Sequence, residues 1–574
     1  MRTLSSIFFY ILIYAVSAYS YAEEPPAIID YDSRFHPVFG KQGMVVTREE
    51  VASGVGLQIL EKGGNAVDAA VAVGFALAVT LPRAGNLGGG GFMMVHLAKE
   101  DKTIALDYRE MAPGGAFREM FQNKAGEVDK DLARYSYRSA GIPGTVAGLT
   151  HALNKYGTMK LADVIAPAIA LAEKGFKVTP VLANDLKIKK PRLSKSEAAK
   201  KIFYKKNGSD YEFGDVLIQS DLAWSLKQIS KKGSKAFYQG EIAKRIVADS
   251  NRHDGLFQLS DLKAYKVIER EPVVGSYRGH KIVSMPPPSS GGIHLVQMLN
   301  ILEGYNLSDM GHNSANYIHT LTETMKLAYA DRSRYLGDPD FYNVPVEWLT
   351  SKSYADELRK KISPIRSTPS SEIMPGKKPA YESDETTHYS VVDKDGNYVS
   401  NTYTLNFTYG SGIVVEGTGI LLNNEMDDFS AKPGTANGFG LIGGEANAVA
   451  ARKRPLSSMT PTIVFKEGKP IMALGSPGGS TIITVVLQTL LNVVDHDMNI
   501  AQATSVPRIH HQWFPDILRL EPGINRDTVE LLRAKGHKTY LGKTLGSMQG
   551  IMSIGGNLYG ASDPRRPGAK AVSY

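Results

Sequence analysis

A threonine at the start of a strand-like segment is the first residue whose position points to chemistry. Residues 363–385 are rich in proline, serine, threonine and lysine. This composition excludes a regular helix or a central strand and predicts a flexible linker. β-Branched and aromatic residues begin at Thr386. If the bond between Glu385 and Thr386 were cut, the threonine hydroxyl would acquire its own α-amine as a base. With an ordinary pKa of about 7.7–8, that amine would make Thr386 a usable nucleophile near neutrality.

A predicted hairpin supplies a second hydroxyl group. The strand that begins near Thr386 is followed by a turn at Asp395-Gly396 and then by a second strand. A turn centred there pairs Thr404 with Thr387 and Leu405 with Thr386. The Thr404 hydroxyl would then lie one residue away from Thr386. A β-bulge or a frayed strand start would bring the two hydroxyls together, and the pattern does not choose between them.

Two glycines are placed where they could bind a developing negative charge. Gly478 and Gly479 stand just before a helix that we expect to run to about Val494. The first N–H groups of a helix have no partner within the helix, and its dipole favours an anion there. Glycine also lets a tetrahedral intermediate approach the backbone closely. We therefore interpret the pair as an oxyanion hole, with an ordinary tight turn as the alternative.

Charged residues indicate a ligand that carries both signs of charge. Three acids lie within Asn423–Asp428, and hydroxyls follow an arginine in Arg454–Met459. The acids would suit a ligand cation, whereas the hydroxyls and Arg109 would suit a carboxylate. A metal ion is the competing explanation for the acids. No histidine accompanies them at ligand spacing and there is no H-E-x-x-H motif, so we expect no metal.

Composition narrows the function classes further. The chain has 574 residues, with 43% hydrophobic and 22% charged residues, which is typical of a folded protein of more than one ordinary core. It has no cysteine, which excludes a cysteine nucleophile, disulfides and thiolate metal sites. The net charge of +8 is mild for this length and does not indicate nucleic-acid binding. The basic stretch 185–206 is interpreted as a solvated face, with contact to an acidic surface as the alternative.

Helices and strands must position these residues. Helical spacing predicts a helix over 48–60 and a mostly buried helix from Asn65 to about Thr80. The glycine-rich run Gly85–Gly91 fails the nucleotide-loop patterns and leads into a strand over 92–97. A second pair of strands is expected within 462–475. Sheets flanked by helices on both sides would accommodate this pattern.

The pattern of the first 22 residues predicts a secretory signal peptide. A short cationic start is followed by the apolar run Ile7–Val16 and then by small residues, with Ala22 as a possible cleavage point. An uncleaved anchor is the alternative. No later stretch predicts a stable membrane span. We therefore expect a periplasmic or secreted protein.

Taken together, these motifs resemble those of the γ-glutamyltransferase (γ-glutamyl transpeptidase) family of N-terminal-nucleophile hydrolases. The resemblance covers nearly the whole of the chain after the signal segment and is specific because many motifs occur together. The motifs are Gly63–Ala70, Asn86–Phe92, Asp107–Glu110, Pro286–Gly292, Thr386–Ser390, Leu422–Phe429, Pro455–Met459 and Gly475–Gly479.

The resemblance implies an α+β fold, a four-layer αββα sandwich. It also implies that the chain cuts itself before Thr386. The two products, residues 23–385 and 386–574, would stay together as a heterodimer of a large and a small subunit. It implies no cofactor.

The resemblance also implies a role for each candidate site residue. Thr386 would be the nucleophile, Thr404 would assist its activation, and Gly478 with Gly479 would form the oxyanion hole. The remaining residues would hold the two charged groups of the substrate. Arg109, Ser457 and Ser458 would hold its α-carboxylate, and Asn406, Glu425 and Asp428 its α-amine.

The implied reaction is γ-glutamyl transfer. The substrates would be glutathione and other γ-glutamyl compounds, and the acceptors would be water, amino acids or dipeptides. Two departures from the family pattern stand out. Phe439, in the lid loop 433–444, replaces a tyrosine that some relatives hydrogen-bond to the equivalent of Asn406, and Glu425 replaces a glutamine. Two alternatives stay open: a glutaryl or cephalosporin acylase of the same fold, and a non-maturing periplasmic protein that binds amino-acid-like ligands.

Overall fold

The computed structural model describes residues 33–373 and 386–574. The expected signal segment, most of the expected linker and Glu385 lie outside the described residues. The chain divides into two units, Met1–His36 and Pro37–Tyr574. Only residues 33–36 of the first unit are described, so the account below concerns the second.

Local sequence explains how the main helices begin. The Asn65 side chain accepts hydrogen bonds from the amides of Val67 and Asp68, and the Asp68 carboxylate accepts one from the Asn65 amide at 2.8 Å. This capping box starts α3 (Ala66–Thr80), which is buried along its whole length, as the apolar composition predicted. Glu49 caps α2 (Glu50–Glu61) in the same way.

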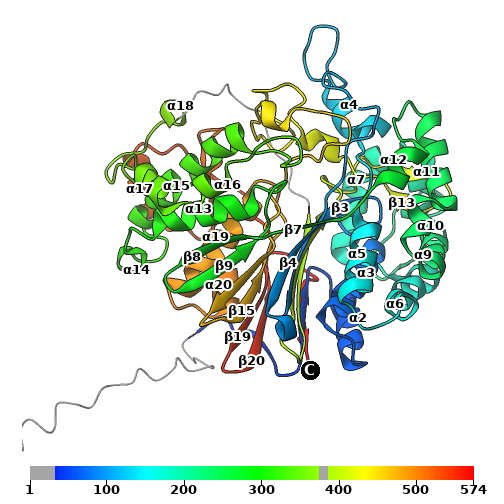
Figure 1. Ribbon diagram of the computed structural model, residues 1–574, viewed down its shortest axis with the longest axis horizontal. Helices are drawn as coiled ribbons and strands as arrows, with labels where there is room; N and C mark the ends of the chain where they lie inside the picture. Colours follow the sequence, from blue (N-terminus) through cyan, green and yellow to red (C-terminus); the bar gives the residue numbers. More distant parts are fainter. Residues whose placement is uncertain (1–32, 374–385) are drawn as a thin grey trace, which may run out of the picture. The chain divides into compact units, whose positions relative to one another are not determined.

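Two seven-stranded sheets of the described chain form the centre of the fold (Figure 1). The first, in spatial order, contains β21 (Lys570–Ser573), β2 (Met44–Thr47), β10 (Thr387–Val392), β11 (Tyr398–Thr404), β3 (Gly90–Leu97), β4 (Lys102–Tyr108) and β7 (Ile268–Arg270). The second contains β1 (Val38–Gly40), β20 (Asn557–Ser562), β19 (Gln549–Ile554), β15 (Lys469–Leu474), β14 (Thr462–Lys466), β9 (His280–Ser284) and β8 (Val273–Tyr277). Neighbouring strands are antiparallel throughout both sheets.

The sheets pack face to face, and a layer of helices covers each outer face. Side chains from both sheets meet in one buried cluster, which includes Val46 and Met94 from the first sheet and Ile463 and Ala473 from the second. Larger clusters join the helices to each sheet. The first layer includes α2, α3, α5 (Thr145–Tyr156), α6 (Leu161–Lys174) and α9 (Ser220–Lys232). The second includes α13 (Gly291–Leu302), α15 (Ala315–Tyr335), α19 (Thr481–Val494), α20 (Ile500–Ser505) and α21 (Arg526–Ala534). The predicted αββα sandwich is confirmed.

Shorter elements complete the body. They are α4 (Lys130–Tyr135), α7 (Pro180–Leu193), α8 (Glu197–Phe203), α10 (Ser234–Tyr238), α11 (Glu241–Arg252), α12 (Leu259–Ala264), α14 (Leu307–Met310), α16 (Val346–Leu349), α17 (Lys352–Arg359), α18 (Ser370–Ile373), the small sheets β5 (Phe176–Lys177) with β6 (Val216–Leu217), β12 (Val414–Val415) with β13 (Ile420–Leu421), and β16 (Ile509–His510) with β17 (Leu518–Leu520) and β18 (Thr539–Leu541), and the 3₁₀ turns η1 (Ala98–Glu100), η2 (Tyr137–Ser139), η3 (Glu425–Asp428) and η4 (Glu445–Asn447).

Residues 363–373 differ from the flexible linker expected there. Hydrogen bonds hold them to the body: the Ser367 amide donates to the Lys535 carbonyl at 2.7 Å, and the Ser370 hydroxyl donates to Asp516 at 2.8 Å. The segment ends in one helical turn, α18. Its prolines exclude a long helix but leave room for side-chain and loop hydrogen bonds, which composition alone does not reveal.

Candidate active site

The hairpin of β10 and β11 brings two hydroxyls together. Thr387 pairs with Tyr403 and His388 with Thr402, which sets Thr386 opposite Thr404. The two threonine Oγ1 atoms are 3.4 Å apart.

The predicted register, with Leu405 opposite Thr386, is therefore wrong by one residue, and neither a bulge nor a frayed strand is needed. The reason is the loop. It has five residues, 393–397, and the Asp393 carboxylate accepts hydrogen bonds from the amides of Asp395 and Asn397. An odd number of loop residues shifts the pairing away from the register of a two-residue turn.

Thr386 is buried at the beginning of β10. Only 4% of its surface is exposed, and its carbonyl accepts a hydrogen bond from Arg48 Nη1 at 2.8 Å. Thr404 Oγ1 accepts a hydrogen bond from the Asn406 amide at 2.8 Å. The threonine is thus fixed from both sides, by a residue near the beginning of the chain and by the neighbouring strand.

Gly478 and Gly479 turn their backbone in the way that glycine permits. Their φ angles are +137° and +52°. Their carbonyls accept hydrogen bonds from the amides of Thr481 and Ile482, the first residues of α19. In the described chain, neither glycine N–H has an acceptor. Gly479 also lines the same cavity as Thr386.

Arg109 lies between two acids, Glu425 and Asp428. Directly after β4, it is 1% exposed and donates through Nη1 to Glu425 Oε1 and through Nη2 to Asp428 Oδ2 at 2.5 Å. Burial alone would lower the pKa of Arg109, but Glu425 and Asp428 raise it above its ordinary value. The cation and the acids expected to bind opposite ends of a substrate are therefore paired with each other here.

Two acceptor atoms of the site residues are suited to bind a cation. Asn406 Oδ1 and Glu425 Oε2 are buried and have no hydrogen-bond donor in the described chain. The other amide atom of Asn406, Nδ2, donates to the Asn424 carbonyl at 2.9 Å, which fixes the side-chain orientation. Because buried acceptors without a donor are costly, this side of the cavity suits an ammonium group.

The opposite side carries hydroxyls and a second arginine. Ser457 and Ser458 line the cavity, and Arg332 of α15 donates to Ser458 Oγ at 3.2 Å and to Ser290 Oγ at 3.0 Å. Arg332 is buried and no carboxylate lies within ion-pair distance of it in the described chain. Burial lowers its pKa to about 10, so the guanidinium stays charged and suits a carboxylate ligand.

One small cavity joins these groups. Its volume is about 20 Å³, which is close to the space that one water needs and far less than an amino acid needs. Of the predicted site residues that the structure describes, all except Gly478 line it. They are Thr386, Thr404, Arg109, Asn406, Glu425, Asp428, Ser457, Ser458, Gly479 and Phe439.

Phe439 covers the cavity. It is 5% exposed, and its ring lies 5.2 Å from the ring of Phe407 in an edge-to-face arrangement. Its loop is tied to η3, because the Gly438 amide donates to Asp427 at 2.7 Å and Asn437 Nδ2 donates to Asp428 at 3.3 Å. Backbone and asparagine contacts therefore hold the loop of Phe439 against η3, and the role of Phe439 as a lid stays a prediction.

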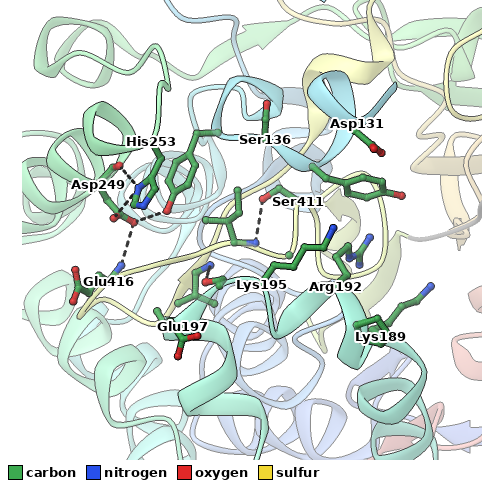
Figure 2. Close-up of a pocket in the computed structure, with 18 of the residues that line it drawn as sticks. Asp131, Ser136, Lys189, Arg192, Lys195, Glu197, Asp249, His253, Ser411 and Glu416 are labelled. Atoms are coloured by element: carbon green, nitrogen blue, oxygen red, sulfur yellow. Dashed lines mark hydrogen bonds and ion pairs between the residues drawn. The ribbon is translucent and has the colours of Figure 1, made fainter. Parts of the chain in front are cut away.

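A much larger cavity contains none of the predicted site residues. Its volume is about 1460 Å³, and α4, α7, α8, α11 and the loop 411–417 line it (Figure 2). Figure 2 shows Lys189 and Lys195 of the basic stretch on one side and Asp249 and Glu416 on the other. Size alone therefore does not identify the chemistry in this molecule. The nucleophile and the orphan acceptors do so.

One group of described residues has the composition of a metal site. The ligand atoms of His319, Glu323 and His537 lie within 4.8 Å of one another. The two histidine rings already share a hydrogen bond of 2.8 Å between Nδ1 and Nε2, and Glu323 accepts one from Lys326 at 2.9 Å. Since the group is hydrogen-bonded and lies beside the Lys326 ammonium, these contacts explain the group without a metal.

In the described part of the chain, no helix combines the length and apolar character needed to cross a membrane.

Arg332 and Arg48 are the site residues that the sequence analysis missed. Arg332 lies two positions before Arg334, which is exposed, and no local motif separates the two. Arg48 reaches Thr386 across 338 positions of sequence. Only the fold could have identified either contact.

Comparisons with known proteins give matches over most of the chain. The family described as Gamma-glutamyltranspeptidase matches residues 52–573. The chain is 53% identical over 555 residues to the glutathione hydrolase proenzyme of Escherichia coli K12, covering 96% of this chain and 95% of the relative.

Two solved structures are also similar. γ-Glutamyltranspeptidase from Helicobacter pylori is 50% identical, with a TM-score of 0.56 over 57% of this chain and 93% of that chain. Cephalosporin acylase from Bacillus halodurans is 29% identical, with a TM-score of 0.84 over 96% of this chain and 99% of that chain.

Proposed function

Because this chain belongs to the γ-glutamyltranspeptidase family, we propose that it is a self-cleaving γ-glutamyltransferase and glutathione hydrolase. It cuts its own chain before Thr386 and then transfers γ-glutamyl groups from glutathione and related amides to water, amino acids or dipeptides. The observation that carries the proposal is one closed cavity in which the Thr386 and Thr404 hydroxyls lie 3.4 Å apart, beside Arg109 and Asp428.

The reaction divides into two acyl transfers. After cleavage, the new α-amine of Thr386 takes the proton of its own hydroxyl while Oγ1 attacks the γ-carbonyl carbon. The N–H groups of Gly478 and Gly479 stabilise the resulting oxyanion. The C–N bond then breaks, the amine product leaves with a proton, and a γ-glutamyl ester remains on the threonine. Water or an acceptor amine attacks this ester and restores the hydroxyl.

Recognition depends on both charges of the glutamyl head. Arg109, Ser457 and Ser458 bind its carboxylate, and Asn406, Glu425 and Asp428 bind its ammonium. The zwitterion replaces the ion pair between Arg109 and Asp428, so each charge keeps a partner. A substrate without the ammonium would leave Asp428 unpaired, which disfavours a glutaryl or cephalosporin acylase. The 53% identity to a glutathione hydrolase, against 29% to a cephalosporin acylase, supports the same choice.

The products of cleavage are a large piece, residues 23–385, and a small piece, residues 386–574, which stay together. Strands of both alternate in the first sheet: β2 and β3 belong to the large piece, and β10, β11 and β21 to the small one. We assign residues 1–22 to a signal peptide that exports the chain to the periplasm or the cell exterior, on the strength of its charge and apolar pattern.

The decisive experiment is N-terminal sequencing with intact mass spectrometry. The wild-type protein should give two pieces, the smaller beginning at Thr386. Thr386→Ala should remain one chain without activity, whereas Thr386→Ser, which keeps a hydroxyl, should still cleave. γ-Glutamyl and glutaryl anilides, compared in a spectrophotometric assay, should give activity with the first only. An uncleaved chain that turns over γ-glutamyl substrates would refute the mechanism.

A further inference from the structure

A group of buried acids surrounds Arg109 and exceeds what the substrate's ammonium requires. Glu110 follows Arg109 directly after β4 and is fully buried, and its Oε2 lies 3.6 Å from Arg109 Nη1. The same Nη1 donates to Glu425, which is 1% exposed, and Nη2 donates to Asp428. Three carboxyl groups therefore meet at one guanidinium.

Three carboxyl oxygens in this group have no donor. Both oxygens of Glu110 and Oε2 of Glu425 are shielded from solvent and accept no hydrogen bond from the described chain. Two buried carboxylates with unsatisfied oxygens repel each other and are costly to bury. A proton held between them removes both costs, because the protonated carboxyl becomes a donor to the other.

The balance of charge around the cavity also favours one proton on the carboxyl groups. Among the described residues, Arg109 and Arg332 are the cations that line the cavity. The other acids nearby have separate partners: Asp427 pairs with Arg134 at 2.9 Å, and Asp107 pairs with Arg270 and Arg454. The Tyr265 hydroxyl donates to the Arg109 carbonyl at 2.8 Å. Two cations thus face three carboxyls, and one proton makes the group neutral.

Glu425 is the carboxyl best placed to hold the proton. Burial raises its pKa well above the ordinary value, beyond the lowering effect of Arg109. Burial also raises the pKa of Glu110 to about 7 and that of Asp428 above its usual range, and Arg109 opposes the rise at both. Glu425 Oε1 accepts from Arg109, its Oε2 has no donor, and neither oxygen of Glu110 has one. A proton on Glu425 Oε2 would supply Glu110 with the donor that it lacks.

We propose that Glu425 is a neutral carboxylic acid whose proton is shared with Glu110, so that Asp428 alone supplies the negative charge that binds the substrate's ammonium group. Glu110 is a positioning residue, because it acts on the substrate only through Glu425 and Arg109. The part about the ammonium rests on the proposed function, whereas the shared proton is a property of the protein itself.

Infrared difference spectroscopy of the mature protein tests the shared proton without any substrate. At pH 7, the wild-type spectrum minus that of Glu425→Gln should contain the C=O stretching band of a protonated carboxylic acid. Glu110→Gln should lower the pH at which this band disappears, since it removes the anion that retains the proton. The absence of the band, or an unchanged midpoint in the Glu110 variant, would overturn the proposal even in a fully active enzyme.

Two matched acid-to-amide changes on η3 test the division of charge. Glu425→Gln should raise KM for a γ-glutamyl anilide only about 3- to 10-fold, because it alters a neutral hydrogen bond. Asp428→Asn should raise KM about 100-fold or more, because it removes the counter-charge of a buried ammonium. Equal increases in the two variants would show that Glu425 is ionised and would refute the assignment. If no γ-glutamyl substrate is turned over, the proposed function fails, while the infrared result still decides the shared proton.

Discussion

Gly479 packs directly against the ring of Phe439. A Cβ atom added to Gly479 would lie 2.5 Å from Cδ1 of the Phe439 ring, and the glycine φ of +52° also disfavours a side chain. We expect Gly479→Ala to displace either the ring or the N–H that faces the oxyanion. The variant should lose about 10²-fold in kcat, as is typical when one such donor is misplaced.

A double variant separates the two causes. If the ring is the obstacle, Gly479→Ala combined with Phe439→Ala should recover part of the rate lost by the single variant. Steady-state kinetics on purified, fully cleaved protein gives the comparison. A double variant slower than both single variants would show that the backbone conformation, and not the ring, is responsible.

Among the elements, the loop 393–397 sets the register of the two strands that carry Thr386 and Thr404. Its length determines which side chain of β11 stands opposite Thr386, and a shift of one residue turns every side chain of the strand to the other face. Deletion of Lys394 should therefore remove the Thr404 hydroxyl from Thr386 and abolish self-cleavage. Lys394→Ala, which keeps the length, is the control and should be cut normally. Normal cutting of the deletion variant, seen on a denaturing gel, would contradict this view of the register.

At the scale of the whole molecule, the order of the strands determines whether the two cleavage products can separate. In the first sheet, β2 of the large piece lies between β21 and β10 of the small piece, and β11 of the small piece pairs with β3 of the large one. Separating the two cleavage products would therefore break three strand pairs. The inter-sheet cluster also takes residues from both pieces.

We therefore expect no exchange of pieces between mature molecules. When two mature samples with different mass labels on their small pieces are mixed, native mass spectrometry should find only the original pairings after a day. The same mixture, unfolded in denaturant and refolded, serves as the positive control for mixed pairings. Mixed pairs in native buffer would mean that the pieces associate through a separable interface.

How far the sequence predicts this structure differs from residue to residue. Asn65 and the apolar run after it specify a capped, buried helix, and Gly478 with Gly479 specifies a turn before a helix, because short-range sterics and hydrogen bonds decide both. The register of β11 was missed, since Asp393 closes a five-residue loop where a two-residue turn was expected. Arg332 could not be found at all. Its burial depends on helix packing, which does not distinguish it locally from Arg334.

The contact between Arg48 and Thr386 has a consequence for the life of the molecule. These residues are 338 positions apart, and β2, β10 and β11 must all be paired before Arg48, Thr386 and Thr404 meet. The scissile bond therefore becomes reactive only in a chain that has already reached its final arrangement. Each cleaved chain has therefore folded correctly at least once. The cleaved fraction of a preparation measures how many chains have folded, even when activity has since been lost.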